Sequence, residues 1–325
     1  MALENKAISV PVSIAPMMGY TDRHARYLHR LISPHSLLYT EMLTAQALMH
    51  DNADHLLQFD SCEHPVALQL GGSDPEQMAQ AARTGADAGY DEININIGCP
   101  SDRVQSGAFG ACLMATPGLV AQIFAAMQDA IDIPVTVKHR IGIDDQDSYE
   151  DLDRFVGTLA EAGCMTFVIH ARKAWLKGLS PKQNRDIPPL DYERVYKLKQ
   201  DYPQLRIIIN GGIKTAAQVN CHLAHTDGVM IGREAFNQPW LLAELESVLF
   251  RDADEVLSRR MVQQSYAKYM QEELKKGTSV HVLVRPLSGL FHGLPGARNW
   301  RRMLSGDAQK TTGSMDDLVT LVAEY

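Results

Sequence analysis

The sequence predicts an α/β protein built as a (β/α)8 TIM barrel, followed by a small all-helical C-terminal domain. Short apolar segments rich in β-branched residues occur eight times within about 230 residues, and segments with helical spacing lie between them. After Pro239 the strand pattern ends and only helical patterns remain. Eight alternations of strand and helix favour the barrel over a doubly wound sheet, which usually has fewer repeats.

The expected strands are apolar runs bounded by polar or Gly-rich segments. They lie at 12–15, 37–40, 66–70, 92–97, 134–138, 166–170, 206–210 and 227–231. Helices are expected between them at 75–88, 117–130, 149–162, 192–200 and 216–223. In these segments apolar residues recur near helical spacing, and Asp, Ser or Thr lies close to the start.

The C-terminal part of the chain contains helical patterns at 241–250, 254–276, 280–291, 297–304 and 315–323. We therefore expect two domains, a barrel over residues 1–245 and a helical domain over residues 246–325. The boundary is placed where the strands stop, because no Gly/Ser-rich linker marks it.

The composition is that of a soluble globular protein, with 45% hydrophobic residues and a net charge of −8. No segment approaches the ~20 apolar residues that a membrane helix needs. We therefore expect a cytoplasmic monomer without a membrane partner. The five cysteines are an odd number without CxxC spacing, which predicts free thiols and neither a disulfide framework nor a metal site.

The net negative charge argues against a general nucleic-acid binder such as a DNA-binding protein, but the charges are distributed unevenly. Two stretches, 170–185 and 274–306, contain 11 lysines and arginines and no acidic residue. Without them the chain has 20 basic and 39 acidic residues. The ordinary interpretation of a charge run is a solvated face, and a polyanion-binding surface is the alternative.

A thiol is predicted at the carboxyl end of the fourth strand, the end at which barrel enzymes place their chemistry. Cys99 follows this strand, and Pro100 cannot continue it because proline has no N–H to donate. A cysteine is more often a buried apolar residue. Here the position beside Asn94 and Asn96 and the Gly-rich continuation favour a functional role, with Cys112 as the alternative reactive thiol.

The other strand ends also present polar or Gly-rich groups. They are Pro16, Met17 and Met18 after the first strand, Gln69 on the third, Lys138 on the fifth, His170 on the sixth, Asn210, Gly211 and Gly212 at the seventh, and Gly232 and Arg233 after the eighth. Backbone N–H groups of the glycines together with Arg233 predict a phosphate site. Lys138 is interpreted as a cation beside an electron-rich ring or as a Schiff-base amine, and His170 as a donor to a phosphate or ring. A structural polar role is the alternative for both.

Several longer motifs extend through nearly the whole chain: APMMGYTDRHAR, LYTEM, ALQLGG, NINIGCPSDRVQSGAFGACLM, VKHRIGID, HARKAWLKGLSPKQNRDIPPLDY, INGGI and DGVMIGREAF. Together they resemble the tRNA-dihydrouridine synthase family. RKAWLKGLSPKQNR and GARNWRR resemble the branch that modifies uridines 20 and 20a. The resemblance implies an FMN-binding catalytic barrel and a helical tRNA-binding domain, which reduce the C5–C6 double bond of uridine in the tRNA D loop to 5,6-dihydrouridine with NADPH as electron donor.

Carried over position by position, the resemblance assigns the rim residues to three groups. The FMN-binding group is Pro16, Met17, Met18, Gln69, Lys138, His170, Asn210, Gly211, Gly212, Gly232 and Arg233. Asn96 is expected to contact the target nucleotide, and Lys182, Arg185, Arg298 and Arg301 to orient the tRNA. His139 departs from the family pattern, in which Thr is frequent. An outward His139 matters little, whereas an inward one beside Lys138 perturbs the flavin.

Cys99 is the expected acid of this chemistry. Reduced flavin N5 delivers a hydride to C6 of the base, and Cys99 delivers a proton to C5 on the other face. A free cysteine has a pKa of ~8.5, so it is mostly protonated at neutral pH. This predicts that no cation lies close beside the Cys99 sulfur.

Three other activities remain compatible with the residues. An FMN-dependent barrel reductase of a free small molecule keeps the flavin without tRNA. A lyase uses Lys138 as a Schiff-base nucleophile, and a non-catalytic RNA-binding protein uses only the basic stretches.

Overall fold

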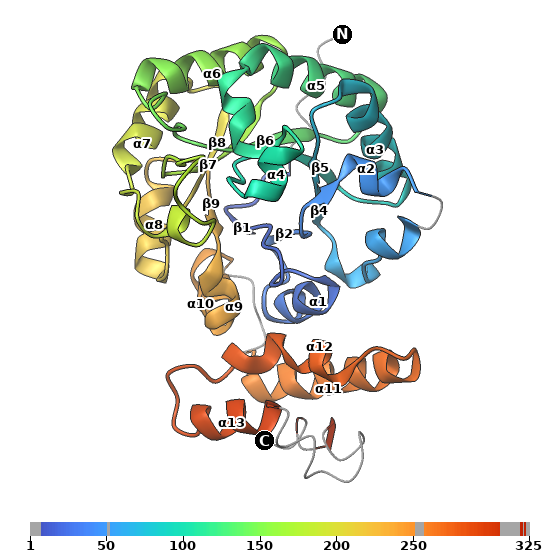
Figure 1. Cartoon of the computed structure of the whole chain (residues 1–325). Helices are drawn as coiled ribbons and strands as arrows, with labels where there is room; N and C mark the ends of the chain where they lie inside the picture. The colour runs from blue at the N-terminus through green and yellow to red at the C-terminus, as the bar shows by residue number, and fades with distance from the viewer. Residues whose placement is uncertain (1–7, 51–52, 251–256, 306–318, 321, 323–325) are drawn as a thin grey trace.

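The computed structural model describes residues 8–50, 53–250, 257–305, 319, 320 and 322. Its parallel strands form a barrel surrounded by helices (Figure 1). The strands are β1 (Val12–Ile14), β2 (Leu37–Tyr39), β3 (Leu43–Thr44), β4 (Val66–Gly71), β5 (Glu92–Ile97), β6 (Val135–Arg140), β7 (Thr166–His170), β8 (Arg206–Asn210) and β9 (Gly228–Ile231). Pairing of β2 with both β1 and β4 closes the barrel, which confirms the predicted fold class.

Eight of these strands match the predicted segments to within two residues at either end. The additional strand, β3, is two residues long and, among the described residues, pairs with the end of β4, where Leu43 lies opposite Leu70. A two-residue strand is too short to produce a visible alternation of apolar and polar residues, so the sequence pattern did not predict it.

Helices cover the outside of the barrel. They are α1 (Arg23–Ile32), α2 (Ala45–Leu48), α3 (Pro75–Asp87), α4 (Asp102–Ser106), α5 (Pro117–Ala130), α6 (Tyr149–Glu161), α7 (Tyr192–Asp201), α8 (Ala216–Leu223), α9 (Arg233–Asn237) and α10 (Trp240–Leu249). The five helices predicted between strands are confirmed to within one residue. Side-chain caps define several starts, for example Asp74, which accepts the N–H of Gln77 at 2.8 Å.

In the described residues after α10, the helices are α11 (Arg259–Lys275), α12 (Val280–Val284) and α13 (Ala297–Leu304). The single helix expected over 280–291 is wrong, because α12 ends at Val284 and a 3₁₀ helix follows over Pro286–Gly289. Pro286 lacks an N–H and its ring clashes with the preceding turn, which interrupts an α-helix. The helix expected over 315–323 falls largely outside the described residues. Within the described part of the chain, no helix has the length and apolarity needed to cross a membrane.

The C-terminal helices are attached to the barrel through α1 and the loop that precedes it. Glu273 on α11 pairs with Arg23 at 2.5 Å, and Arg285 pairs with Asp22. The ring of Tyr269 stacks on that of Tyr27 with 3.8 Å between centroids. Since this loop follows β1, the C-terminal helices lie beside the carboxyl end of the barrel, the end that carries the candidate site.

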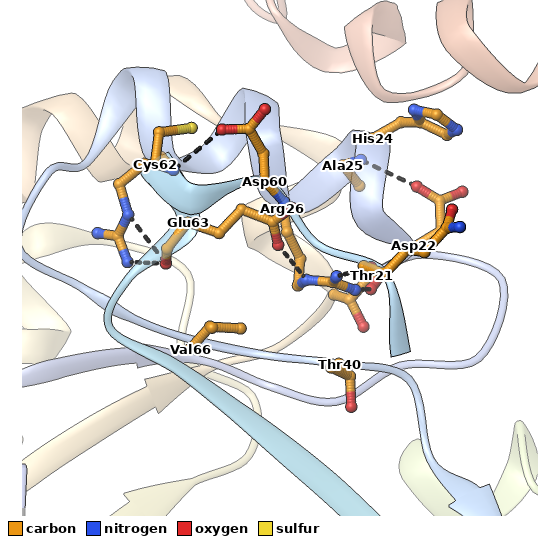
Figure 2. Close-up of polar contacts among 12 residues, drawn as sticks. Thr21, Asp22, His24, Ala25, Arg26, Thr40, Asp60, Cys62, Glu63 and Val66 are labelled. Atoms are coloured by element: carbon orange, nitrogen blue, oxygen red, sulfur yellow. Dashed lines mark hydrogen bonds and ion pairs between the residues drawn. The ribbon is translucent and has the colours of Figure 1, made fainter. Parts of the chain in front are cut away.

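A buried ion pair holds α1 against the segment that leads into β4 (Figure 2). Arg26 Nε donates to Glu63 Oε2 at 2.6 Å, and Arg26 Nη1 donates to the Thr21 carbonyl at 3.0 Å. Burial raises the pKa of Glu63, and the charge of Arg26 opposes this shift. Breaking a buried ion pair costs about 3–5 kcal/mol, so the pair keeps the Arg26 side chain in place. The hydrogen bond from Arg26 to the Thr21 carbonyl then fixes the rim loop after β1.

The barrel interior has a polar wall and an apolar wall. In β5, Ile93, Ile95 and Ile97 belong to the core between strands and helices, while Glu92, Asn94 and Asn96 face the barrel interior. The apolar part of the interior consists of Ala15, Leu37, Tyr39, Ala67, Val168, Ile208 and Met230. Polar groups therefore enter the interior mainly from β4, β5 and β6, and these strands lead to the Cys99 loop.

Candidate active site at the barrel mouth

The loop after β5 holds Cys99 at the mouth of the barrel. Asn96 Oδ1 accepts the N–H groups of Gly98 at 3.1 Å and of Cys99 at 2.9 Å. The Cys99 carbonyl accepts the N–H of Ala111 at 2.9 Å, and a Cβ at Gly110 would lie only 2.6 Å from that oxygen. Gly110 also has a φ of +76°, so glycine is required there for two reasons.

The Cys99 thiol is partly exposed, and it donates to Ser101 Oγ at 3.4 Å. The backbone contacts on both sides of the residue fix its position, while the residue itself stays partly exposed. This is the arrangement expected for a thiol that meets a substrate, and it differs from that of Cys164, which is fully buried.

Arg140 connects the Cys99 loop to the loop after β7, residues 171–190. Its Nε donates to the Gly98 carbonyl at 2.8 Å, and its Nη1 donates to the carbonyls of Lys173 and Asn184, both at 3.1 Å. Gln105 makes a second connection by donating to the carbonyls of Pro100 and Leu176. We did not predict a role for Arg140. Its position two residues after Lys138, on the same face of β6, was the available signal.

Positive charge is concentrated around His170. Burial is the main reason that the pKa of His170 lies well below its ordinary value, and the charges of Arg140, Lys138, Arg172 and Arg185 lower it further. His170 is therefore a neutral imidazole at physiological pH. Three arginines and one lysine around a neutral ring form a site suited to anionic groups.

Lys138 lies in this cluster and donates to Asn210 Oδ1 at 3.2 Å. Burial lowers its pKa to about 7, the charge of Arg140 adds to this shift, and Cys99 opposes it. Arg140 interacts electrostatically with Cys99 as well. Lys138 and Arg140 thus lie on the Cys99 side of the mouth, because they face inward from β6 beside the end of β5. The hydrogen-bond partner of the sulfur is Ser101, so the expectation that no cation lies close beside it stays a prediction.

The turn after β8 is built from Gly211 and Gly212, which have φ values of +122° and +70°. A Cβ at Gly211 would lie 2.7 Å from the His170 ring, so this glycine allows the imidazole to approach the turn. Tyr192 supports the turn by donating its hydroxyl to the Gly211 carbonyl at 2.7 Å. His170 thus lies beside this turn and within the group formed by Lys138, Arg140, Arg172 and Arg185.

Arginines lie on the same side of the mouth. Arg172 Nε is buried and has no hydrogen-bond partner among the described residues, which is costly unless a ligand accepts from it. Arg233 interacts with Arg172 electrostatically, but its Nη2 also pairs with Asp186 Oδ1 at 2.9 Å. The sequence pattern suggested Arg233 as a free phosphate ligand and did not identify this pairing or the role of Arg172.

The remaining predicted cofactor residues lie along the same rim. Gln69 donates to Asn94 and accepts from Asn96, both at 2.8 Å. Met17 packs on the apolar wall and lies 3.9 Å from the position of a Cβ at Gly232. Pro16 is partly buried, whereas Met18 is 64% exposed.

His139 faces outward. Its ring lies between Phe155 of α6, at 5.0 Å, and Phe167 of β7, at 5.8 Å between centroids. Its Nδ1 shares a hydrogen bond with the carbonyl of Arg140 at 2.7 Å. His139 is therefore a core residue between barrel and helix, and its departure from the family pattern leaves the mouth unchanged.

The predicted RNA-binding residues form two groups. Lys182 and Arg185 are exposed on the 171–190 loop, beside the cation cluster. Arg298 and Arg301 are exposed on α13, which Figure 1 shows beyond α11 and away from the barrel. A ligand that contacts both groups must extend from the 171–190 loop to α13.

Comparisons with known proteins agree with this geometry. The family model described as Dihydrouridine synthase (Dus) matches residues 13–322. A protein of Shewanella oneidensis named tRNA-dihydrouridine(20/20a) synthase is 54% identical over 96% of this chain and 93% of its own length. Proteins of the same name from Synechocystis and Vibrio cholerae are 57% and 54% identical over 91% and 95% of this chain, and over 88% and 94% of their own lengths. The chain belongs to the dihydrouridine synthase family and is an enzyme.

Proposed function

We propose that this enzyme reduces uridines 20 and 20a in the D loop of tRNA to dihydrouridine, with FMN as its cofactor and NADPH as electron donor. The concentration of Lys138, Arg140, Arg172 and Arg185 around neutral His170, beside an accessible cysteine, is the observation that supports it most directly. The relatives named tRNA-dihydrouridine(20/20a) synthase supply the substrate and the positions.

The residues at the mouth fit FMN. The buried, unpartnered Nε–H of Arg172 and the Gly211–Gly212 turn offer donors suited to a phosphate, and Lys138 offers a cation suited to an electron-rich ring. We assign cofactor binding to Pro16, Met17, Met18, Gln69, Lys138, His170, Asn210, Gly211, Gly212, Gly232 and Arg233. When bound, FMN supplies the hydride that reduces C6 of the uracil ring.

Cys99 supplies the proton to C5. Its backbone is held on both sides, so the thiol has a defined position relative to Asn96, for which we propose a contact with the target nucleotide. Ser101 Oγ, 3.4 Å from the sulfur, is the hydrogen-bond acceptor that orients the thiol.

The target uridine must leave its stack to enter the mouth, which costs a few kcal/mol. Phosphate contacts by Lys182 and Arg185 near the mouth and by Arg298 and Arg301 on α13 offset this cost. We accordingly assign FMN binding and catalysis to residues 1–245 and tRNA binding to residues 246–325, with Lys182 and Arg185 extending the tRNA surface onto the barrel.

An anaerobic titration tests the proposal. The purified protein should show flavin absorption bands that bleach with NADPH and return when unmodified tRNA is added, and dihydrouridine should appear at positions 20 and 20a. Bleaching without reoxidation by tRNA would favour a reductase of small molecules. A reconstituted protein that retains no flavin would exclude both activities.

FMN binding is expected to bring uptake of a proton at Lys138. With a pKa of about 7, the free protein has an uncharged amine in roughly half of its molecules at neutral pH. An electron-rich partner raises this pKa, so uptake of about 0.5 proton is expected at pH 7, more at pH 8 and almost none at pH 5. Calorimetric titrations in buffers of different ionisation enthalpy measure it. The difference from Lys138→Met isolates this residue, and equal uptake by both proteins would contradict the assignment.

A further inference from the structure

A continuous chain of side-chain hydrogen bonds runs along the polar wall of the barrel, from Glu92 near its closed end to the Cys99 loop. Tyr39 and Thr136 donate their hydroxyls to Glu92 Oε1 at 2.6 and 2.7 Å. Asn94 Nδ2 donates to Thr136 Oγ1 at 2.8 Å, and Gln69 Nε2 donates to Asn94 Oδ1 at 2.8 Å. The chain then reaches Asn96, whose Nδ2 donates to Gln69 Oε1 at 2.8 Å.

Every bond in this chain points the same way, and both ends require that direction. At the mouth, Asn96 Oδ1 must accept because its partners are the backbone N–H groups of Gly98 and Cys99. Its amide nitrogen must then donate to Gln69, and the same reasoning passes through Asn94 to the Thr136 hydroxyl. At the closed end Glu92 Oε1 accepts from the hydroxyls of Tyr39 and Thr136, which completes the same direction.

Burying a carboxyl group at the end of such a chain of hydrogen bonds costs free energy. Glu92 is 2% exposed, and burial raises its pKa, although the hydrogen bonds from Tyr39 and Thr136 oppose that shift. The opposite wall of the barrel is closed by apolar side chains such as Val168 and Ile208, so packing alone does not need a charge here. This cost is explained if Glu92 orders the residues at the other end of the chain, beside Cys99.

We propose that Glu92 is a positioning residue. Through Thr136, Asn94 and Gln69 it fixes the amide orientation of Asn96 and thereby the backbone of the Cys99 loop. Gln69 and Asn96 are also assigned to the cofactor and the nucleotide, so this inference rests on the proposed function for its catalytic consequence. The structural consequence, an ordered Cys99 loop, is independent of any ligand.

The chain is best cut at Thr136→Val, which replaces the hydroxyl by a methyl group of similar size. Asn94 Nδ2 then has no acceptor and Glu92 loses one of its two donors, so the amides are free to rotate. Thr136→Ser keeps the hydroxyl and should restore the chain. Ile95→Val, on the outward face of β5, is the matched control because it removes core volume without touching the chain.

Hydrogen exchange in the protein without cofactor gives the first readout. Between Gly98 and Ser101 only three residues have an amide proton, because Pro100 has none, and two of the three donate to Asn96. We expect these amides to exchange at least about tenfold faster in Thr136→Val. They should exchange at the original rate in Thr136→Ser and Ile95→Val. Unchanged exchange in Thr136→Val, or equal acceleration in Ile95→Val, would overturn the proposal.

Reoxidation by tRNA gives the second readout. In the FMN-loaded protein, Thr136→Val should lower the rate of this step by about tenfold at saturating tRNA. The salt dependence of tRNA binding should stay the same, since the phosphate contacts are elsewhere. A loss of rate without faster exchange at Gly98 and Cys99 would contradict positioning. If the unaltered protein never reacts with tRNA, the proposed function fails, and the exchange result still decides whether the chain orders the loop.

Discussion

Replacing Cys99 by alanine is expected to slow reoxidation of the reduced enzyme by tRNA by about 10²–10⁴-fold, the usual contribution of a positioned general acid. The loop itself should persist, because it is held by the backbone N–H and carbonyl of residue 99 and by Arg140. Flavin content and reduction by NADPH should therefore match those of the unaltered protein. Stopped-flow measurement of the two half-reactions separates these effects.

Serine at position 99 is the informative comparison for this variant. Its hydroxyl has nearly the same shape as the thiol but is a far weaker acid, so most of the loss should remain. Reoxidation of the alanine variant at the original rate would show that another group delivers the proton. The cations around His170 offer no such group close by except Lys138, whose pKa of about 7 makes it the next candidate.

Reversing the charges of Lys182 and Arg185 together is expected to weaken tRNA binding by at least about 100-fold at low salt. Both side chains are exposed on the 171–190 loop, where a phosphate can reach them. Each phosphate contact contributes roughly 0.7–0.9 to the slope of log affinity against log salt, so the slope should fall by about 1.5. Binding of labelled tRNA at several salt concentrations measures both quantities.

The control for this variant carries the same change in charge elsewhere. The control is Arg83→Glu with Lys197→Glu, on the exposed faces of α3 and α7. Each reversal lowers the net charge by two units, so the control and the test variant both change it from −8 to −12. A purely global effect of charge would weaken tRNA binding equally in both variants and would remove Lys182 and Arg185 from the binding surface. Retained flavin in both confirms that the roles are separate.

The barrel was predictable because parallel strands covered on both sides are short, apolar and regular. The segments at 92–97 and 166–170 coincide with β5 and β7 residue for residue. The same regularity placed Lys138, His170 and Gly211 at one end of the barrel, where the structure brings them together. A residue at the barrel rim can thus be predicted wherever the strand before it can be predicted from the sequence.

Contacts between loops were not predictable, because they depend on partners far apart in the sequence. Arg140 reaches carbonyls 33 and 44 residues away, and Asp186 pairs with Arg233 across two strands. The nearness of Lys138 and Arg140 to Cys99 follows from the register of β5 against β6, which no local pattern reveals. Pro286 indicates an interruption of the helix, but the apolar residues around it recur at helical spacing, and we therefore expected one continuous helix.

The two-residue period of β5 has a consequence for how this gene can change. Odd positions supply isoleucines to the outer core and even positions supply the polar chain that reaches Asn96. Inserting or deleting one codon within the strand would reverse the facing of every residue on one side of the change, turning isoleucines toward the barrel interior and polar side chains into the apolar layer. Substitutions in β5 and changes in the length of the loops around it preserve this alternation. A change in the number of residues in the strand does not, so we expect the strand length to be constrained.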